Sequence, residues 1–396
     1  MKKKINRLLV LTHQPLNKYY VERFGLNHLN KSRAKVTFLN LLFLVNRDVA
    51  NNYLKKNVVK YSQNYKNIKS YKSLFDEINK FNGDFFYINI LGSFHLINLI
   101  LTIYLRLKGG KSIVIQNTFI PQKEETINNK LLRLIKKNNL IKSIIFLITK
   151  KTISNVSQFL SSKPFYVFVG NQHLFDLNLK KYLKKVQKVS SHDYFNYHQV
   201  RNKKKLTGLG KKKYVLFIDQ EQDLTFDHRM NFSKEAYIKS NYWERMEDFF
   251  RFLEKKTGME VIIAGHYRRT NVKILKNRRV YFDKTPLLVH YSSIVLTHDS
   301  NALNLAVLSK KPIIFLTLDE FKNRSGKSEG IEKISKLLKN IVVNIDENYK
   351  KYFKNNYKKV SIKDYESYEK KYITFKNKIK VESMWITILN KLENTI

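Results

Sequence analysis

The sequence contains no cysteine, and this absence excludes several kinds of structure and chemistry. Without thiols the chain forms no disulfide, no thiolate metal site and no cysteine nucleophile. A chain without disulfides fits a reducing compartment.

Acidic residues are also scarce. The chain has 32 Asp and Glu against 75 Lys and Arg, which gives a formal net charge of +43. Lys accompanies abundant Asn, Ile and Tyr, as an AT-rich coding bias would produce, but that bias favours Glu as well. The basic excess therefore indicates an anionic partner, such as phospholipid headgroups or a phosphorylated substrate.

Long apolar runs are missing too. The N-terminal stretch "MKKKINRLLVLTHQPL" has a basic start but no small-residue cleavage site, so it predicts a buried first strand. The most apolar stretch, Ser93–Lys111, carries His95 and Arg106 and falls short of the ~20 apolar residues of a spanning helix. It predicts a core helix, with membrane contact through a basic surface as the functional alternative. We expect a cytoplasmic protein, peripheral at the inner face of the cytoplasmic membrane.

Apolar segments of strand length alternate with amphipathic segments of helix length along the chain. This order predicts an α/β protein with parallel sheets, and 396 residues suggest two domains. We therefore expect two Rossmann-like doubly wound domains facing each other across a cleft. The predicted strands are Arg7–Leu11, Lys35–Leu39, Asp84–Ile90, Ser112–Gln116 and Phe165–Val169 in the first half, and Tyr214–Ile218, Met259–Ala264, Ile294–Thr297, Pro312–Thr317 and Ile341–Ile345 in the second.

A basic, turn-rich segment separates the two series of strands. It places the N-terminal domain at residues 1–200, the linker at 201–213 and the second domain at 214–363. The last segment, 364–396, is polar and helical in pattern.

Polar residues follow the strands of the second half. Ligands of doubly wound sheets bind at the carboxyl ends of the strands, so these clusters predict a binding site. Ser300 or Asn301 can cap the helix predicted at Ala302–Ser309, whose first amides would then face a phosphate. The clustered residues are Asp219, Glu221, His266, Arg268, Arg269, Thr285, His298, Asp299, Ser300 and Asn301.

Each of these residues also has an ordinary structural explanation. Ser and Asn at helix starts are more often caps than ligands. Acidic residues after a strand are often solvated, and adjacent arginines often form surface ion pairs. The four clusters favour a phosphate site because all of them fall at the same edge of one predicted sheet.

The segments "IIAGHYRR" and "TPLLVHYSSIVLTHDSNALNLAVLSKKPIIFLT" resemble the nucleotide-binding half of GT-B glycosyltransferases. The resemblance is to bacterial surface-polysaccharide transferases, namely Kdo-transferases, polysialyltransferases and CDP-glycerol transferases. It implies that His266 matches the His of a His-Pro element and that Ser300 and Asn301 match a Ser/Thr pair. Both elements hold nucleotide phosphates in such enzymes. Tyr267 replaces the proline here, and Asn301 replaces a hydroxyl residue.

The resemblance also implies an activity. We expect transfer of a sugar from a nucleotide-sugar donor to a surface-glycan or lipid-linked acceptor, as in lipopolysaccharide or capsule synthesis. A CMP-linked nonulosonate is the first expected donor, and UDP- or CDP-linked sugars are the second. Asp219 or Glu221 would be the general base, with Asp193 in reserve, and no metal or cofactor is expected. Residues 1–200 would bind the acceptor, 214–363 the donor, and 364–396 would cross back to the first domain.

Two other functions remain open. A nucleotide-sugar 2-epimerase uses the same fold, although the "HDSN" segment lacks the paired glycines expected there. Nucleic-acid binding would suit the charge, but Lys is dispersed and no recognition motif is visible, so no nucleic-acid partner is expected. His13, after the first strand, could contact an acceptor, although a lone His is more often structural.

Overall fold

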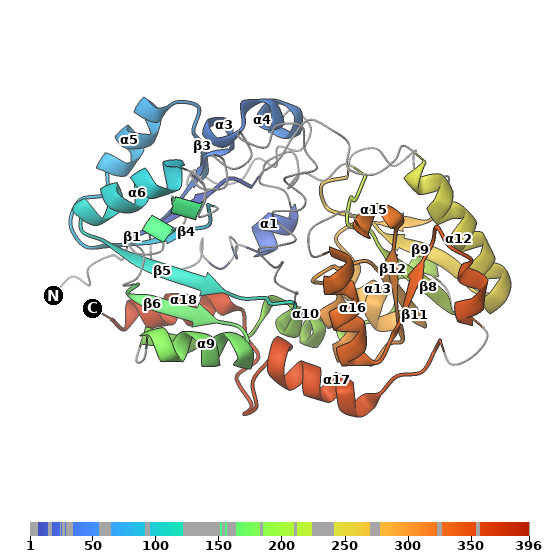
Figure 1. Cartoon of the computed structure of the whole chain (residues 1–396). Coiled ribbons are helices and arrows are strands. Elements are labelled where there is room, and N and C mark those ends of the chain that lie inside the picture. The colour runs from blue at the N-terminus through green and yellow to red at the C-terminus, as the bar shows by residue number, and fades with distance from the viewer. Residues whose placement is uncertain are drawn as a thin grey trace.

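The protein forms two α/β lobes, each built on one parallel sheet (Figure 1). The two Rossmann-like domains expected from the alternating pattern are confirmed. The computed structural model describes residues 7–14, 18–23, 25, 28, 35–54, 65–91, 96–121, 151–152, 155–156, 164–182, 185–209, 212–223, 241–269, 278–322, 327–353 and 357–395.

The first lobe holds a seven-stranded sheet in the order β3-β2-β1-β4-β5-β6-β7. Its strands are β1 (Arg7–Thr12), β2 (Lys35–Asn40), β3 (Tyr65–Asn67), β4 (Phe85–Asn89), β5 (Gly110–Gln116), β6 (Tyr166–Val169) and β7 (Val186–Lys188). Its described helices are α1 (Lys18–Arg23), α3 (Leu42–Val45), α4 (Arg47–Leu54), α5 (Tyr71–Asn79), α6 (Leu96–Leu107), α9 (Gln172–Tyr182) and α10 (His192–Val200).

The second lobe holds a six-stranded sheet in the order β10-β9-β8-β11-β12-β13. Its strands are β8 (Tyr214–Ile218), β9 (Glu260–Ala264), β10 (Val280–Tyr281), β11 (Ile294–Thr297), β12 (Ile313–Thr317) and β13 (Ile341–Asn344). The helices that follow them are α12 (Tyr242–Thr257), α13 (Thr285–Tyr291), α14 (Leu303–Leu308), α15 (Asp319–Lys322) and α16 (Lys327–Leu338).

The central strands are apolar on both faces because helices cover both faces of each sheet. Strand β8, for example, is buried along its whole length and joins the large second-lobe core with α12. The strands that the sequence did not predict are β3, β7 and β10. Each has only two or three residues and lies at or next to the edge of its sheet, where one side carries no neighbouring strand.

The C-terminal segment is not one continuous helix. It forms α17 (Ile362–Tyr368), a short π-helical turn (Glu369–Ile373) and then α18 (Met384–Glu393). Helix α17 packs on the second lobe, whereas α18 packs in the core of the first lobe through Trp385 and Ile388. The segment between them is bonded to the first lobe, since Gln172 N–H donates to Thr374 O at 2.7 Å.

Helix α10 joins the two lobes. It follows β7 of the first sheet and packs against α13 and α14 of the second lobe (Figure 1). Helix α1 also lies between the lobes in this view. In the described part of the chain, no helix has both the length and the apolar character needed to cross a bilayer.

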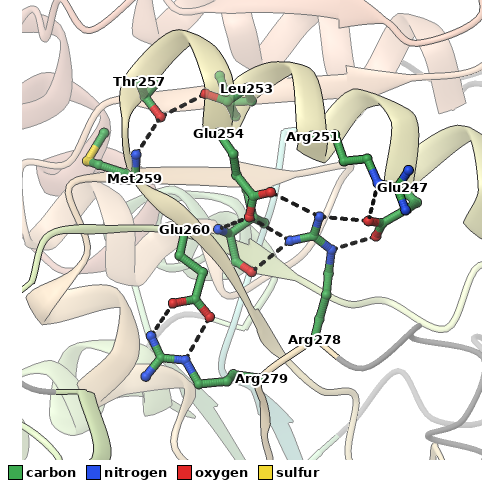
Figure 2. Close-up of polar contacts among 10 residues, drawn as sticks. Glu247, Arg251, Leu253, Glu254, Thr257, Met259, Glu260, Arg278 and Arg279 are labelled. Atoms are coloured by element: carbon green, nitrogen blue, oxygen red, sulfur yellow. Dashed lines mark hydrogen bonds and ion pairs between the residues drawn. The ribbon is translucent and has the colours of Figure 1, made fainter.

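A cluster of ion pairs fastens the two residues before β10 to α12 and to β9 (Figure 2). The Arg278 guanidinium bonds to two carboxylates of α12, with Nε 2.6 Å from Glu247 and Nη1 2.7 Å from Glu254. The Arg278 side chain is only 10% exposed. The neighbouring Arg279 pairs with Glu260 on the surface.

This contrast predicts different effects on stability. Arg278→Ala leaves Glu254 without its cation and Glu247 with only the exposed Arg251, and it should lower the free energy of unfolding by about 2 to 3 kcal/mol. Arg279→Ala removes a solvent-screened pair and should cost less than about 1 kcal/mol. Chemical denaturation of both variants measures the difference, and equal losses would contradict the role assigned to Arg278.

Candidate functional site

A buried ion pair joins the carboxyl ends of β8 and β9. The guanidinium of Arg269, which has no exposed side-chain surface, bonds to both oxygens of Asp219 and both oxygens of Asp223. Asp219 also accepts the main-chain N–H of His266 at 3.2 Å and that of Glu221 at 2.8 Å. These bonds hold the two loops that follow the strands in one fixed arrangement.

The ion pair leaves Asp219 unsuited to act as a general base. Burial would raise the pKa of its carboxyl, but the bonds and charge of Arg269 outweigh burial and hold that pKa below the usual value. Burial would likewise lower the pKa of Arg269, whereas Asp219 and Asp223 raise it overall. Asp219 and Arg269 therefore support the two loops, and their side chains are engaged with each other and with Asp223. The prediction that they contact substrate is corrected accordingly.

Glu221 lies at the centre of the remaining polar group. Its carboxylate is 2% exposed, 3.5 Å from His266 Nδ1 and 3.8 Å from Arg268 Nε. Neither carboxylate oxygen has a hydrogen-bond partner among the described residues. Its backbone φ of +53° lies in the left-handed region, which costs a residue with a side chain about 1 kcal/mol or more. A strained, unsatisfied buried carboxylate beside an imidazole is typical of a functional site.

His266 and Arg268 keep polar atoms at the same edge. The His266 side chain is 15% exposed, and its ring lies 4.3 Å from that of Tyr267. Arg268 is mostly buried and lies over the Tyr267 ring at 5.1 Å. The structure thus brings together three residues that the sequence predicted as a site: Glu221, His266 and Arg268.

His298 belongs to the core instead. It is fully buried, with Nδ1 2.8 Å from the carbonyl of Leu316 and Nε2 3.0 Å from the hydroxyl of Tyr242. Burial, with the charge of Lys327, lowers the pKa of its imidazole to about 4, so the ring is neutral at pH 7. Both ring nitrogens are used, which corrects the expectation that His298 binds phosphate.

Asp299 is also engaged within the protein. Its Oδ1 accepts from Gln220 Nε2 at 2.9 Å and from Lys327 Nζ at 3.0 Å. Burial would raise the pKa of this carboxyl, but Lys327 holds it below the usual value. Asp299 therefore connects the loop after β11 to α16, and its negative charge does not favour a phosphate beside it.

Ser300 and Asn301 remain at the start of α14, but the predicted cap differs. The Ser300 hydroxyl accepts from Ala302 N–H at 3.2 Å, and α14 itself begins at Leu303 with no side-chain cap. Its first amides already bond to the carbonyls of residues 300–302. The helix terminus consequently offers fewer free donors than expected, and the side chains of half-buried Ser300 and exposed Asn301 are what the loop presents.

Two other predicted residues lie on helices α13 and α10. Thr285 is the half-buried first residue of α13. Asp193 lies on α10, where it accepts a hydrogen bond from Asn304 of α14 at 3.0 Å. Burial raises the pKa of Asp193 to about 6. Its contact with α14 makes it part of the junction between the lobes.

A polar chain that the sequence analysis missed crosses that junction. His13, after β1, lies 3.2 Å from Gln14 Nε2, whose amide oxygen accepts from the Tyr20 hydroxyl at 2.8 Å. The Tyr20 hydroxyl in turn lies 2.8 Å from the Tyr267 hydroxyl, and the two rings pack edge to face. Tyr267 thus packs against the first lobe from the second. The signal in the sequence was the tyrosine that follows His266 in place of proline.

Within the described residues, His, Asp and Glu form no group of three or more that could hold a metal ion. The cations near Glu221 are His266, when protonated, and Arg268.

Two parallel α/β lobes whose strand ends meet at a shared boundary define the GT-B fold, and the chain has this fold. No family model matches the chain, and neither does any curated protein. Among solved structures it is similar to the wall teichoic acid polymerase TagF. A variant of TagF with a histidine replaced by alanine has a TM-score of 0.53 and 13% identity, over 99% of this chain and 89% of that one. A variant with a histidine replaced by asparagine has a TM-score of 0.52 and 12% identity, over 99% and 90%. The likeness establishes the fold.

The raised pKa of Asp193 predicts a pH-dependent effect of one substitution. Asp193→Asn removes a carboxyl that is costly to ionise where it is buried, while Asn can still accept from Asn304. The native state holds the Asp193 proton up to a pKa of about 6, so wild-type stability from this group falls as pH rises from 4 to 6. The variant should be more stable than wild type by about 2 kcal/mol at pH 7.

The difference should shrink as the pH falls toward 4 and vanish below about pH 3, where Asp193 is neutral in both states. Denaturation curves of both proteins between pH 4 and pH 7 provide the measurement. A constant difference across that range would show that the Asp193 carboxyl titrates normally.

Proposed function

We propose that the protein transfers a sugar or related group from a cytidine-nucleotide donor to a glycan or lipid-linked acceptor. The observation that carries the proposal is the group Glu221, His266 and Arg268 at the strand ends of the second sheet, connected through Tyr267 to the end of β1 in the first. A donor bound by the second lobe would meet an acceptor bound by the first.

The departing nucleotide phosphate would be stabilised by positive charge from the second lobe. Glu221 lies 3.5 Å from Nδ1 of His266 and would orient the ring so that its Nε2 side faces a phosphate oxygen. Arg268 adds a cation that stays charged at any physiological pH. The side chains of Ser300 and Asn301 would complete the phosphate contacts. In this proposal Glu221 positions His266 and does not contact the acceptor.

The acceptor hydroxyl would be activated from the first lobe. His13 is the titratable residue at the end of β1, and Gln14 orients it through the chain that leads to Tyr20 and Tyr267. A neutral His13 imidazole would accept the hydroxyl proton at Nε2 once the acceptor O–H takes the place of the Gln14 N–H there. His13 thereby takes the role of base that the sequence analysis had assigned to Asp219, Glu221 or Asp193.

Cytidine donors are favoured by two lines of support. CMP- and CDP-linked groups were both among the donors implied by the resemblance of "IIAGHYRR" and its following segment. A TagF structure with a TM-score of 0.50 and 12% identity was obtained after a soak with CDPG. The large positive charge suits a phosphate-containing donor and an acceptor at an anionic inner membrane face. No feature of the site favours the epimerase or a nucleic-acid partner over transfer.

A nucleotide panel tests the donor proposal. CMP or CDP should raise the melting temperature of the wild type, because a ligand at 100 times its Kd stabilises the folded form by about 2.7 kcal/mol. His266→Ala should remove this shift. His290→Ala, in the last turn of α13, is the matched control and should keep it. A shift with UDP or GDP alone would reject cytidine donors, and no shift with any of the four would reject the transferase.

Glu221→Gln tests the proposed role of the carboxylate. Without its charge Glu221 no longer holds the His266 ring in place, so kcat should fall about 10- to 100-fold. Nucleotide binding should change little, since the phosphate contacts remain.

Glu260→Gln is the control for this substitution, because Glu260 forms a surface ion pair on the same sheet. A loss of nucleotide binding and of thermal stability in parallel with the loss of kcat in Glu221→Gln would mean that Glu221 only supports the fold.

A further inference from the structure

We propose that the outer face of α6 docks the protein onto an anionic lipid bilayer. Helix α6 is apolar on both sides: Leu101 and Leu105 are fully buried in the first-lobe core, whereas Ile100, Ile103 and Leu107 are 44%, 41% and 80% exposed. A helix on the surface of a globular domain normally directs polar residues to solvent. The outward side chains of α6 therefore indicate a surface that is covered in use.

The exposed residues form one stripe. Positions 100, 103 and 107 have the spacing of neighbours on one side of a helix, so their side chains lie in a row along α6. The helix contains no acidic residue. Its 12 residues span only about 18 Å, far less than the bilayer core of about 30 Å. Such a helix lies in the interface with its apolar stripe among the acyl chains.

Basic residues surround one end of this stripe. The Tyr104 hydroxyl donates to Asn79 Oδ1 at 2.6 Å, and Lys108 Nζ lies 5.7 Å from the centre of the Tyr104 ring. Lys80 follows Asn79, and Arg7 donates to its carbonyl at 3.1 Å. Arg106 adds a further charge in the last turn of α6.

Three acidic residues lie near these cations: Glu77, Asp76, which interacts electrostatically with Lys80, and Asp84, which pairs with Lys111 at 3.1 Å. The carboxylate of Glu77 pairs with Lys80 at 2.7 Å and with Lys66 at 2.8 Å. The rim still has a positive excess, because Arg7, Arg106 and Lys108 add to those three lysines.

This combination favours lipid over a second copy of the chain. Joining two such faces would bring two basic rims together in a protein of net charge +43, which is unfavourable. Anionic headgroups attract the rim, at about 1 kcal/mol for each basic residue near the surface, while the acyl region accepts the stripe. Helix α6 lies on the side of the first lobe remote from the second (Figure 1), so docking leaves the boundary between the lobes accessible. The proposal does not depend on the proposed activity.

Vesicle co-sedimentation of the full chain tests the proposal. Vesicles of phosphatidylcholine with phosphatidylglycerol should bind the wild type, and pure phosphatidylcholine should bind it more weakly. The triple variant Ile100→Ser, Ile103→Ser, Leu107→Ser should lower the partition coefficient by about tenfold or more, since three apolar side chains no longer enter the bilayer. Leu177→Ser with Leu179→Ser on α9 removes exposed apolar residues of the same lobe and should leave binding unchanged.

Circular dichroism and size-exclusion chromatography with light scattering accompany each variant, so that misfolding and changes of oligomeric state are recognised. Equal binding of the triple variant and the wild type would overturn the proposal, and so would an equal loss in the α9 variant. A dimer of the wild type that the α6 substitutions convert to a monomer would assign this face to a second copy instead.

Discussion

The buried pair between Asp219 and Arg269 determines the geometry of everything around it. One guanidinium satisfies two carboxylates and ties the loop after β8 to the loop after β9. The same carboxylate of Asp219 accepts the main-chain N–H groups of Glu221 and His266. These two bonds fix the backbone positions from which both side chains project. The left-handed backbone of Glu221 is tolerated because these bonds over-determine it. An ion pair that is costly to bury is balanced here by a full set of hydrogen bonds.

The central strands were predictable because burial on both faces gives each a continuous apolar run of strand length. The edge strands β3, β7 and β10 were not predictable. Each has only two or three residues, most of them partly exposed, which is too few to give a continuous apolar run. The break between α17 and α18 was missed for a different reason. The polar pattern of the segment suits a helix throughout, and only packing on two separate lobes requires the interruption.

The sequence predicted a cluster of polar residues at the strand ends, but it could not tell which of them satisfy one another. Asp219, Arg269 and His298 are of residue types that often bind ligands. Asp219 and Arg269 instead pair with each other across 50 residues of chain, and His298 bonds to Leu316, 18 residues away. Such pairings appear only in the three-dimensional structure. Glu221 was predictable from its position, although its strain was not. The contact between Tyr20 and Tyr267 spans 247 residues and depends on how the lobes meet, which no local pattern encodes.

The return of α18 to the first lobe means that the polypeptide passes between the lobes twice, once after α10 and once before α18. Two covalent connections restrict the motion of one lobe relative to the other far more than one connection would. They allow the lobes to rotate about the line through both connections and oppose rotation about other axes. The lobes should therefore open and close by rotation about the axis through these two connections. The Tyr20–Tyr267 contact would stabilise the closed arrangement.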